Sequence, residues 1–332
     1  MITRYSLFDK FKSVVTKSKR DKDIDISSVL AISKDMLLTS YEFCADNVYL
    51  YIAEQVAFGP RIPGTKPSIE CALWIVNKLK EFGAVNIEEQ HFQAIAYNGD
   101  ILNGINISAQ INPNVENRIL LFAHWDSRPW ADCDKNPLNR NKPIDGANDG
   151  ASGVGVILEL LRIFAHNHPT CGIDILFIDA EDYGQRIDEP SNVYDDYSWC
   201  LGMQHWISNP TLPLFNVHFA ILLDMVGGQN TIFQREYFSQ YSSNHLNDMV
   251  WHVANQTDNA LYFVEELGNP IIDDHVFLIL NQLPAIAIIG SQEKVLFNST
   301  WHTLDDTIKH IDCRTIKAVG ETLEQLFVSY FA

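Results

Sequence analysis

The chain has 332 residues, of which 46% are hydrophobic and 20% charged, a composition typical of a globular protein with a large core. Its 42 acidic residues outnumber 24 basic ones, and the formal net charge of −18 argues against nucleic acid and anionic membrane as main partners. The six cysteines are scattered without a C-x-x-C pair, which excludes a zinc knuckle and a dense disulfide framework. No apolar run is long enough to span a bilayer.

Residues 1–42 are predicted to be a helical appendage to one large domain that covers residues 43–332. Residues 1–22 contain an apolar stripe at helical spacing, surrounded by basic side chains: Leu7, Phe8, Phe11, Val14 and Val15. Such a helix could touch a membrane surface, but packing on its own domain or on a partner subunit is the simpler interpretation. A second short helix is predicted at 27–41. The first residues have no continuous apolar region or small-residue cleavage site, so no signal peptide is predicted.

Two helices are predicted next, separated by the FGPRIPGT segment at 58–65, whose Gly and Pro residues enforce a turn. The first covers Val48 to Val56. The second begins at Thr65 and ends at Gly83. Its apolar face is expected to hold Ile69, Leu73, Val76 and Leu79.

Strands then alternate with helices. Residues 86–97 and 101–111 are predicted to form a hairpin at Asn98-Gly99. Further strands are expected at 118–126, 174–178, 217–226 and 285–290, and helices at 154–163, 200–208, 244–257 and 312–331. This alternation predicts an α/β protein of three layers, with a mostly parallel, mixed central sheet covered by helices on both faces.

The stretch DILFIDAEDYG, at 174–184, is an apolar strand that ends on clustered acids, Asp179, Glu181 and Asp182. Ligands of open α/β sheets bind at the carboxyl ends of strands. Carboxylates this close shift each other's pKa values unless a cation lies between them. Adjacent acids in an extended turn point different ways, so one can bind a metal while its neighbour acts as a base. A turn of solvated acids is the alternative for this stretch alone.

Two other predicted strands end on possible metal ligands, His124 and Asp224, while Asp149 begins a helix and His302 lies in a Trp-His-Thr turn. Imidazole and carboxylate groups without nearby thiolates suit a catalytic zinc, which needs about three protein ligands and an open position. It also needs a non-ligating acid that moves protons. Taken singly, His124 could be a structural histidine, Asp149 a helix cap and Asp224 a structural acid. Their order and placement together predict a metal site.

These residues stand in motifs that resemble, in order and context, the zinc-dependent aminopeptidase superfamily. The motifs lie within residues 45–332: HWD at 124, NDGASG at 148, AED at 180, LLD at 222 and WHT at 301. Within that superfamily the chain is similar to the glutaminyl-peptide cyclotransferases (glutaminyl cyclases) of the animal and bacterial zinc type. Four segments carry this narrower resemblance: FGPRIPGT at 58, HWDSRPW at 124, DDHVF at 273 and TWHT at 300. The insertion after AEDYG is similar to the bacterial branch.

The resemblance implies a zinc-exopeptidase-like fold and assigns a role to each candidate residue. Asp149, Asp182 and His302 would hold one zinc ion. Glu181 would be the general acid/base, assisted by Asp273, and Asp224 a further hydrogen-bonding acid. Trp301, for which a core tryptophan is the alternative, and His124 are assigned to substrate binding. The implied substrate is a peptide or protein with N-terminal glutamine. It is cyclised to pyroglutamate with release of ammonia, the zinc polarising the amide carbonyl and Glu181 carrying the proton.

Two departures separate the chain from the animal enzymes. Asp182 stands where they carry Glu, and Ala123 and Val154 occupy the expected positions of their disulfide. Neither change removes a catalytic group. Relatives are often exported, and the compartment of this chain stays open.

A two-zinc aminopeptidase is the main alternative. In that enzyme His124 and Asp224 would bind a second metal and Asp149 would bridge the two, and all three residues are present. The DDHVF segment and Trp301 favour the cyclase, for which one zinc per chain is expected instead of two. A binding module without catalysis should have lost a ligand or the base, and none is missing.

Overall fold

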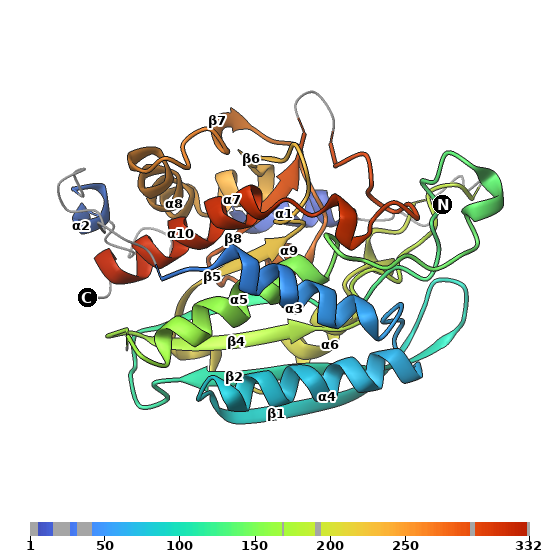
Figure 1. Ribbon diagram of the computed structural model, residues 1–332, viewed down its shortest axis with the longest axis horizontal. Helices are drawn as coiled ribbons and strands as arrows, with labels where there is room; N and C mark the ends of the chain where they lie inside the picture. The colour runs from blue at the N-terminus through green and yellow to red at the C-terminus, as the bar shows by residue number, and fades with distance from the viewer. Residues whose placement is uncertain are drawn as a thin grey trace.

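The computed structural model describes residues 6–15, 27–31, 42–167, 169–189, 194–292 and 296–330. Within these residues an eight-stranded sheet has the order β1-β2-β4-β3-β5-β8-β6-β7 (Figure 1). Its central strands are parallel to one another: β4 (Gly172–Ile178), β3 (Arg118–His124), β5 (Val217–Asp224) and β8 (Ala285–Ser291). Their carboxyl ends therefore meet at one edge of the sheet.

The outer strands make the sheet mixed. The predicted hairpin is present as β1 (Val85–Ile95) and β2 (Ile101–Ile111), and β2 runs antiparallel to β4. At the other edge β6 (Ile232–Arg235) is antiparallel to β8 and parallel to β7 (Phe263–Leu267). The predicted α/β fold with a mixed central sheet is confirmed.

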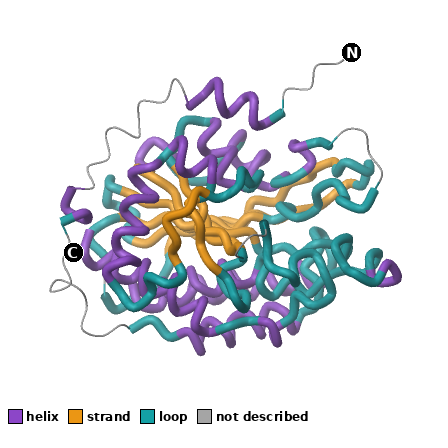
Figure 2. The backbone as a smooth tube through the Cα atoms, turned by 90° about the horizontal axis from the view of Figure 1, so that it is seen from above, coloured by secondary structure: helices purple, strands orange, loops and turns teal. Residues whose placement is uncertain are grey.

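Helices cover both faces of this sheet, so that the strands lie in the middle of the molecule (Figure 2). One layer contains α2 (Ser27–Leu30), α3 (Ala45–Ala57), α4 (Lys66–Glu81), α5 (Ala151–Phe164), α8 (Asn244–Gln256) and α10 (Cys313–Tyr330). The other contains α1 (Leu7–Val15), α6 (Leu201–Ser208), α7 (Tyr237–Ser242) and α9 (Asp274–Leu280). The central strands are apolar on both sides, because alternate residues face opposite layers. In β3, Leu121 packs into the first layer and Phe122 into the second, and both are fully buried.

The helix predicted at 65–83 is α4, but the prediction of its buried face was partly wrong. Ile69 and Leu73 are 55% and 58% exposed. The buried side chains form a neighbouring stripe: Ser68, Cys71, Ala72, Ile75, Val76 and Leu79. Both stripes have helical spacing, and the sheet selects the one whose small residues let the helix approach it closely.

The N-terminal helices pack on the large domain. Leu7 and Phe11 of α1 are 0% and 2% exposed, and α1 contacts α7 and α9. The second predicted helix is described only over α2, since residues 32–41 lie outside the described residues. The boundary at residue 42 stays a prediction. No helix in the described part of the chain is both long and apolar enough to cross a membrane.

Candidate active site

The candidate residues meet at the carboxyl ends of the parallel strands. His124 is the last residue of β3 and Asp224 the last of β5, while Glu181 and Asp182 follow β4. The first turn of α5 lies directly against β5, because a Cβ atom at Gly153 would come within 2.1 Å of the Leu223 carbonyl oxygen. Glycine at this position therefore brings the start of α5 to the strand ends.

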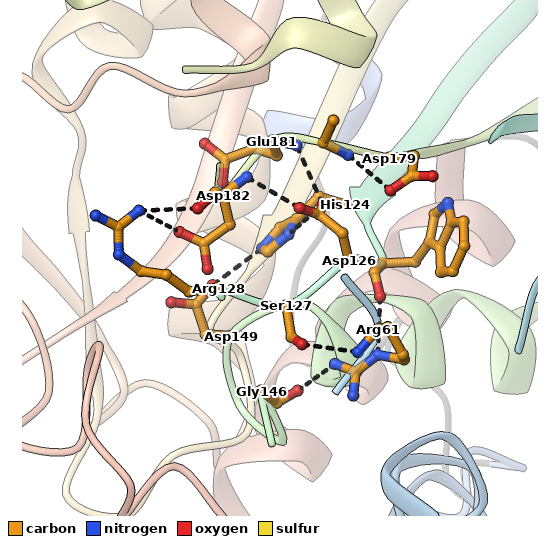
Figure 3. A network of polar contacts seen from close by, with 12 residues as sticks. Arg61, His124, Asp126, Ser127, Arg128, Gly146, Asp149, Asp179, Glu181 and Asp182 are labelled. Carbon is orange, nitrogen blue, oxygen red and sulfur yellow. Dashed lines mark hydrogen bonds and ion pairs between the residues drawn. The ribbon is translucent and has the colours of Figure 1, made fainter. Parts of the chain in front are cut away.

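Two buried carboxylates hold the backbone around the site. Asp126 accepts hydrogen bonds from the backbone nitrogens of Glu181 and Asp182, at 3.1 Å each (Figure 3). Asp306 accepts from the backbone nitrogens of Asn148 and Asp149, at 2.8 and 3.1 Å. Charge-assisted hydrogen bonds of this kind are strong. They fix the directions in which the side chains of the site leave the backbone.

The backbone of the site is strained at four non-glycine residues. Ala180, Cys200, Met225 and His302 have φ angles of 53°, 57°, 50° and 52°. Left-handed conformations cost about 1–3 kcal/mol for such residues and persist only where the surrounding structure enforces them. Ala180 precedes Glu181 and Met225 follows Asp224, so the strain lies at the turns that present the acids.

Asp149, Asp182 and His302 form one compact group of possible metal ligands. His302 Nε2 lies 3.1 Å from Asp182 Oδ1 and 3.6 Å from Asp149 Oδ2. Tetrahedral zinc with bonds of about 2.0–2.1 Å separates its ligand atoms by about 3.4 Å. Asp149 Oδ2 and Asp182 Oδ2 are buried without a hydrogen-bond partner among the described residues. Spacing, chemistry and these unpartnered oxygens fit a zinc ion.

His124 belongs to a second group that shares Asp149. Its Nε2 lies 3.1 Å from Asp149 Oδ1 and 3.2 Å from Asp224 Oδ1, while its Nδ1 is 3.4 Å from Asp126. The fold therefore offers donor sets for one ion, or for two ions that share Asp149. His124 is 1% exposed and is absent from the residues that line the pocket. Its predicted contact with substrate stays a prediction.

Glu181 faces a third group, with Asp273 and Cys200, whose ligand-type atoms all lie within 4.8 Å of one another. Asp273 caps α9 and accepts from the backbone nitrogen of Asp274 at 2.6 Å. Burial raises the pKa of Glu181 well above its usual range, and Asp273 and other nearby acids add to this effect. The neighbours Glu181 and Asp182 thus face different groups, with the first close to acids and the second close to His302.

A pocket of about 350 Å³ opens onto these groups. Its polar lining is Asp149, Glu181, Asp182, Asp224, Asp273 and His302, and its apolar lining includes Trp199, Ile271, Ile289, Phe297 and Trp301. The Trp301 and His302 rings stack with centroids 3.7 Å apart, and Trp199 stacks on His302 at 5.9 Å. Acidic side chains and one histidine thus converge in a pocket whose remaining lining is largely apolar, which is usual for a small-molecule site.

Two buried arginines, to which the sequence motifs assigned no role, also shape this site (Figure 3). Arg61 donates to the carbonyl oxygens of Trp125, Asp145 and Gly146, at 2.9, 2.6 and 2.7 Å, and so holds the loop that leads to Asp149. Arg128 donates to the carbonyl oxygen of Asp182 at 2.8 Å. Arg61 stands in the FGPRIPGT motif and Arg128 in the HWDSRPW motif. Their place in motifs that carry the family resemblance was the sequence signal that could have identified them.

The chain is similar to known proteins both in sequence and in fold. The sequence profile of Peptidase family M28 matches residues 106–327, about two thirds of the chain. A crystal structure of Bacteroides thetaiotaomicron glutaminyl cyclase bound to N-acetylhistamine is 43% identical, with a TM-score of 0.84 over 86% of this chain and 98% of that one. The chain belongs to the glutaminyl cyclases of family M28. The fold is therefore that of a zinc-exopeptidase-like cyclase family.

Two further relatives show that the chain is similar to proteins of more than one description. A leucine aminopeptidase precursor from Bacteroides thetaiotaomicron is also 43% identical, with a TM-score of 0.83 over 88% of this chain and 98% of that one. The glutaminyl-peptide cyclotransferase of Bothrops jararaca is 23% identical over 295 residues, which cover 81% of this chain and 77% of the relative. All six cysteines of this M28 protein are free, in keeping with the missing animal disulfide.

Proposed function

We propose that this protein is a glutaminyl-peptide cyclotransferase, which converts the N-terminal glutamine of a peptide or protein to pyroglutamate and releases ammonia. The observation that carries the proposal is the grouping of Glu181 with Asp273 in the same pocket as Asp149, Asp182 and His302. This arrangement combines a proton carrier with a set of zinc ligands. The similar glutaminyl cyclase from Bacteroides thetaiotaomicron supports the substrate class.

Asp149, Asp182 and His302 would hold one zinc ion through two carboxylate oxygens and an imidazole nitrogen. When bound, zinc supplies Lewis-acid chemistry that makes the side-chain amide carbon of the substrate easier to attack. With three protein ligands, a bound zinc would keep the further position for substrate that a catalytic zinc requires.

Glu181 moves the proton in the proposed reaction. It accepts a proton from the α-amine, whose nitrogen forms a bond to the side-chain amide carbon. The bond from that carbon to the amide nitrogen breaks, and Glu181 returns the proton to this nitrogen, which leaves as ammonia. The raised pKa of Glu181 suits a group that must be protonated and deprotonated in each turnover. Asp273, beside it, assists by sharing the proton.

The pocket floor and walls would orient the substrate. Asp224 lines the pocket and would accept a hydrogen bond from the α-amine. Trp301 would form an aromatic wall beside the glutamine side chain. Holding the amine against the amide carbon in a reactive geometry would contribute to catalysis through orientation. His124 would act by positioning Asp149 and Asp224, whose Oδ1 atoms both lie close to its Nε2.

A two-zinc aminopeptidase is the second candidate, because His124, Asp149 and Asp224 form a further set of possible ligands. The Oδ1 atoms of Asp149 and Asp224 lie 3.1 and 3.2 Å from His124 Nε2. The similar leucine aminopeptidase precursor supports it. In that enzyme the α-amine would bind a metal, and Glu181 would activate water for peptide cleavage.

Parallel assays on one preparation separate the two candidates. A glutaminyl peptide and a leucyl arylamide are offered to the protein while bound zinc is counted. The cyclase predicts ammonia release from the first substrate, no cleavage of the second, and one zinc per chain. Arylamide cleavage with two zinc ions and no ammonia would overturn the proposal.

A further inference from the structure

Arg128 and Asp132 form a buried ion pair beside the candidate zinc ligands. Arg128 Nε donates to Asp132 Oδ1 at 2.8 Å and Nη2 donates to Oδ2 at 2.6 Å, with both side chains 0% exposed. Asp132 Oδ2 also accepts from the backbone nitrogen of Ile187 at 2.9 Å. Two parallel hydrogen bonds fix the carboxylate plane relative to the guanidinium plane. Asp132 is therefore held in a single orientation.

This pair contacts two of the three candidate ligands, which come from distant parts of the chain. Arg128 Nη1 donates to the Asp182 carbonyl oxygen at 2.8 Å and lies 3.5 Å from its Oδ1. Asp132 Oδ1 lies 3.5 Å from His302 Nδ1. The next residue, Cys133, donates its backbone N–H to the His302 carbonyl oxygen at 3.1 Å. One short segment thus holds both the ligand after β4 and the ligand near the C-terminus.

The chemistry of His302 requires a partner of this kind. Its Nε2 faces Asp182 and Asp149, so a metal would bind at Nε2 and the proton would have to reside on Nδ1. Nδ1 is buried, and among the described residues it has no well-formed hydrogen bond. The carboxylate of Asp132 is within ion-pair distance of it. Stacking on Trp301 and Trp199 constrains the ring plane but does not decide which nitrogen carries the proton.

We propose that Asp132, held by Arg128, is a positioning residue that keeps the proton of His302 on Nδ1 and directs Nε2 toward the zinc site. Arg128 also positions Asp182, through its contacts with the backbone carbonyl oxygen and the carboxylate of that residue. Asp132 is not assigned as a ligand of this site, because it lies beside His302 Nδ1, whereas Asp149 and Asp182 lie beside Nε2. Carboxylates that orient metal-binding histidines in this way change metal affinity when they are removed. This inference depends on the zinc site of the proposed function.

Zinc affinity, measured by competition with a chelator, tests the role without an activity assay. Asp132→Asn keeps the volume but removes the charge, and we expect zinc affinity to fall about 10- to 100-fold. The matched control is Asp188→Asn. Asp188 also forms a two-bond pair with an arginine, Arg186, at 2.9 and 3.0 Å, but it contacts no candidate ligand. The control should bind zinc as the wild type does.

A second variant keeps the test valid if Asp132→Asn fails to fold, which could happen because that substitution leaves Arg128 buried without its counter-ion. Arg128→Met with Asp132→Leu removes both charges, and apolar replacement of a whole buried pair is commonly tolerated. We expect this double variant to fold and to lose zinc affinity as Asp132→Asn does. Replacing zinc with Co²⁺ adds a spectroscopic readout, since a reoriented histidine shifts the visible absorption bands of the ion.

His302→Ala separates the two proposals. If it loses zinc while a folded Asp132→Asn protein and the double variant keep wild-type affinity and an unchanged Co²⁺ spectrum, the positioning role is overturned and the zinc site stands. If His302→Ala binds zinc as the wild type does, the zinc site of the proposed function fails, and the positioning role fails with it.

Discussion

The thiol of Cys200 donates a hydrogen bond to the proposed proton carrier, Glu181, with Sγ 3.4 Å from Oε1. Cys200 is fully buried and has a φ angle of 57°, a conformation that a cysteine rarely adopts. Burial and the nearby acid Glu181 raise the pKa of this thiol well above its usual range, so it stays a neutral donor. The thiol therefore steadies one oxygen of Glu181 without adding a charge to the acidic pocket.

Cys200→Ala should slow turnover without releasing zinc. The variant removes one hydrogen bond to Glu181, a loss of about 1 kcal/mol, or roughly fivefold in kcat. Steady-state kinetics with a glutaminyl peptide measures the loss, and zinc content gives the control. A variant with unchanged kcat would show that the thiol only fills space.

Glu181→Gln should abolish most turnover while bound zinc stays intact. The amide keeps the shape of the side chain but cannot carry the proton, and general acid–base catalysis contributes about 10²- to 10⁴-fold to rates. Ammonia release and zinc content are measured on the same sample. Loss of zinc together with activity would mean that the roles of Glu181 and Asp182 are exchanged.

The sequence predicted the parts of the site that sit at the ends of apolar strands. His124, Asp224 and the Glu181-Asp182 pair each follow a run of apolar residues, and parallel strands bring such ends together. The Asp132 contact with His302 could not be predicted in this way, because it joins two loops far apart in the chain. No local pattern reports which loops meet, and only the packed fold supplies that information.

The elements that the sequence missed are short and have weak patterns. β6 has four residues, β7 has five, α7 has six and α9 has seven. β7 contributes exposed glutamates at the sheet edge, so it shows little of the apolar alternation that marks a strand. α9 lies inside the DDHVF motif, which drew attention to Asp273 but not to the helix that Asp273 caps. Tertiary packing rather than local propensity determines such elements.

Glu236 should make the protein sensitive to acid. This buried carboxylate accepts from the backbone nitrogens of Phe238 and Ser239 at 2.9 and 2.8 Å, and lies 3.0 Å from His275 Nε2. Burial acts to raise its pKa, but His275 and these hydrogen bonds outweigh burial and lower the pKa below its usual value. The unfolded chain then binds the proton more tightly. The stabilisation is complete above the unfolded pKa of about 4.3 and is lost as the pH falls through the lower folded value.

Glu236→Gln should cost about 3 kcal/mol at neutral pH, as expected when one partner of a buried pair is removed. The difference from wild type should shrink below about pH 4.3, where the unfolded wild type also binds the proton. Urea unfolding of both proteins, at neutral pH and at pH values below about 4.3, measures this difference in the free energy of unfolding. Glu265→Gln is the control, because Glu265 pairs with Arg235 on the surface and is 61% exposed there. A constant difference at all pH values would contradict the assignment to Glu236.

Phe11→Ala should destabilise the folded protein by about 3 kcal/mol, because it empties a buried aromatic site. Phe11 is 2% exposed, and its ring lies 4.6 Å from that of Phe238 in α7. The matched control is Phe215→Ala, since Phe215 is 81% exposed and should contribute little. Urea unfolding of both variants gives the comparison. The N-terminal segment also reaches the loop beside the pocket, where Asp196 accepts from the backbone nitrogen of Leu7 at 3.0 Å. If Phe11→Ala unfolds like Phe215→Ala, α1 adds no stability to the folded protein, as expected of a separable appendage. A loss of about 3 kcal/mol makes α1 part of the folded core.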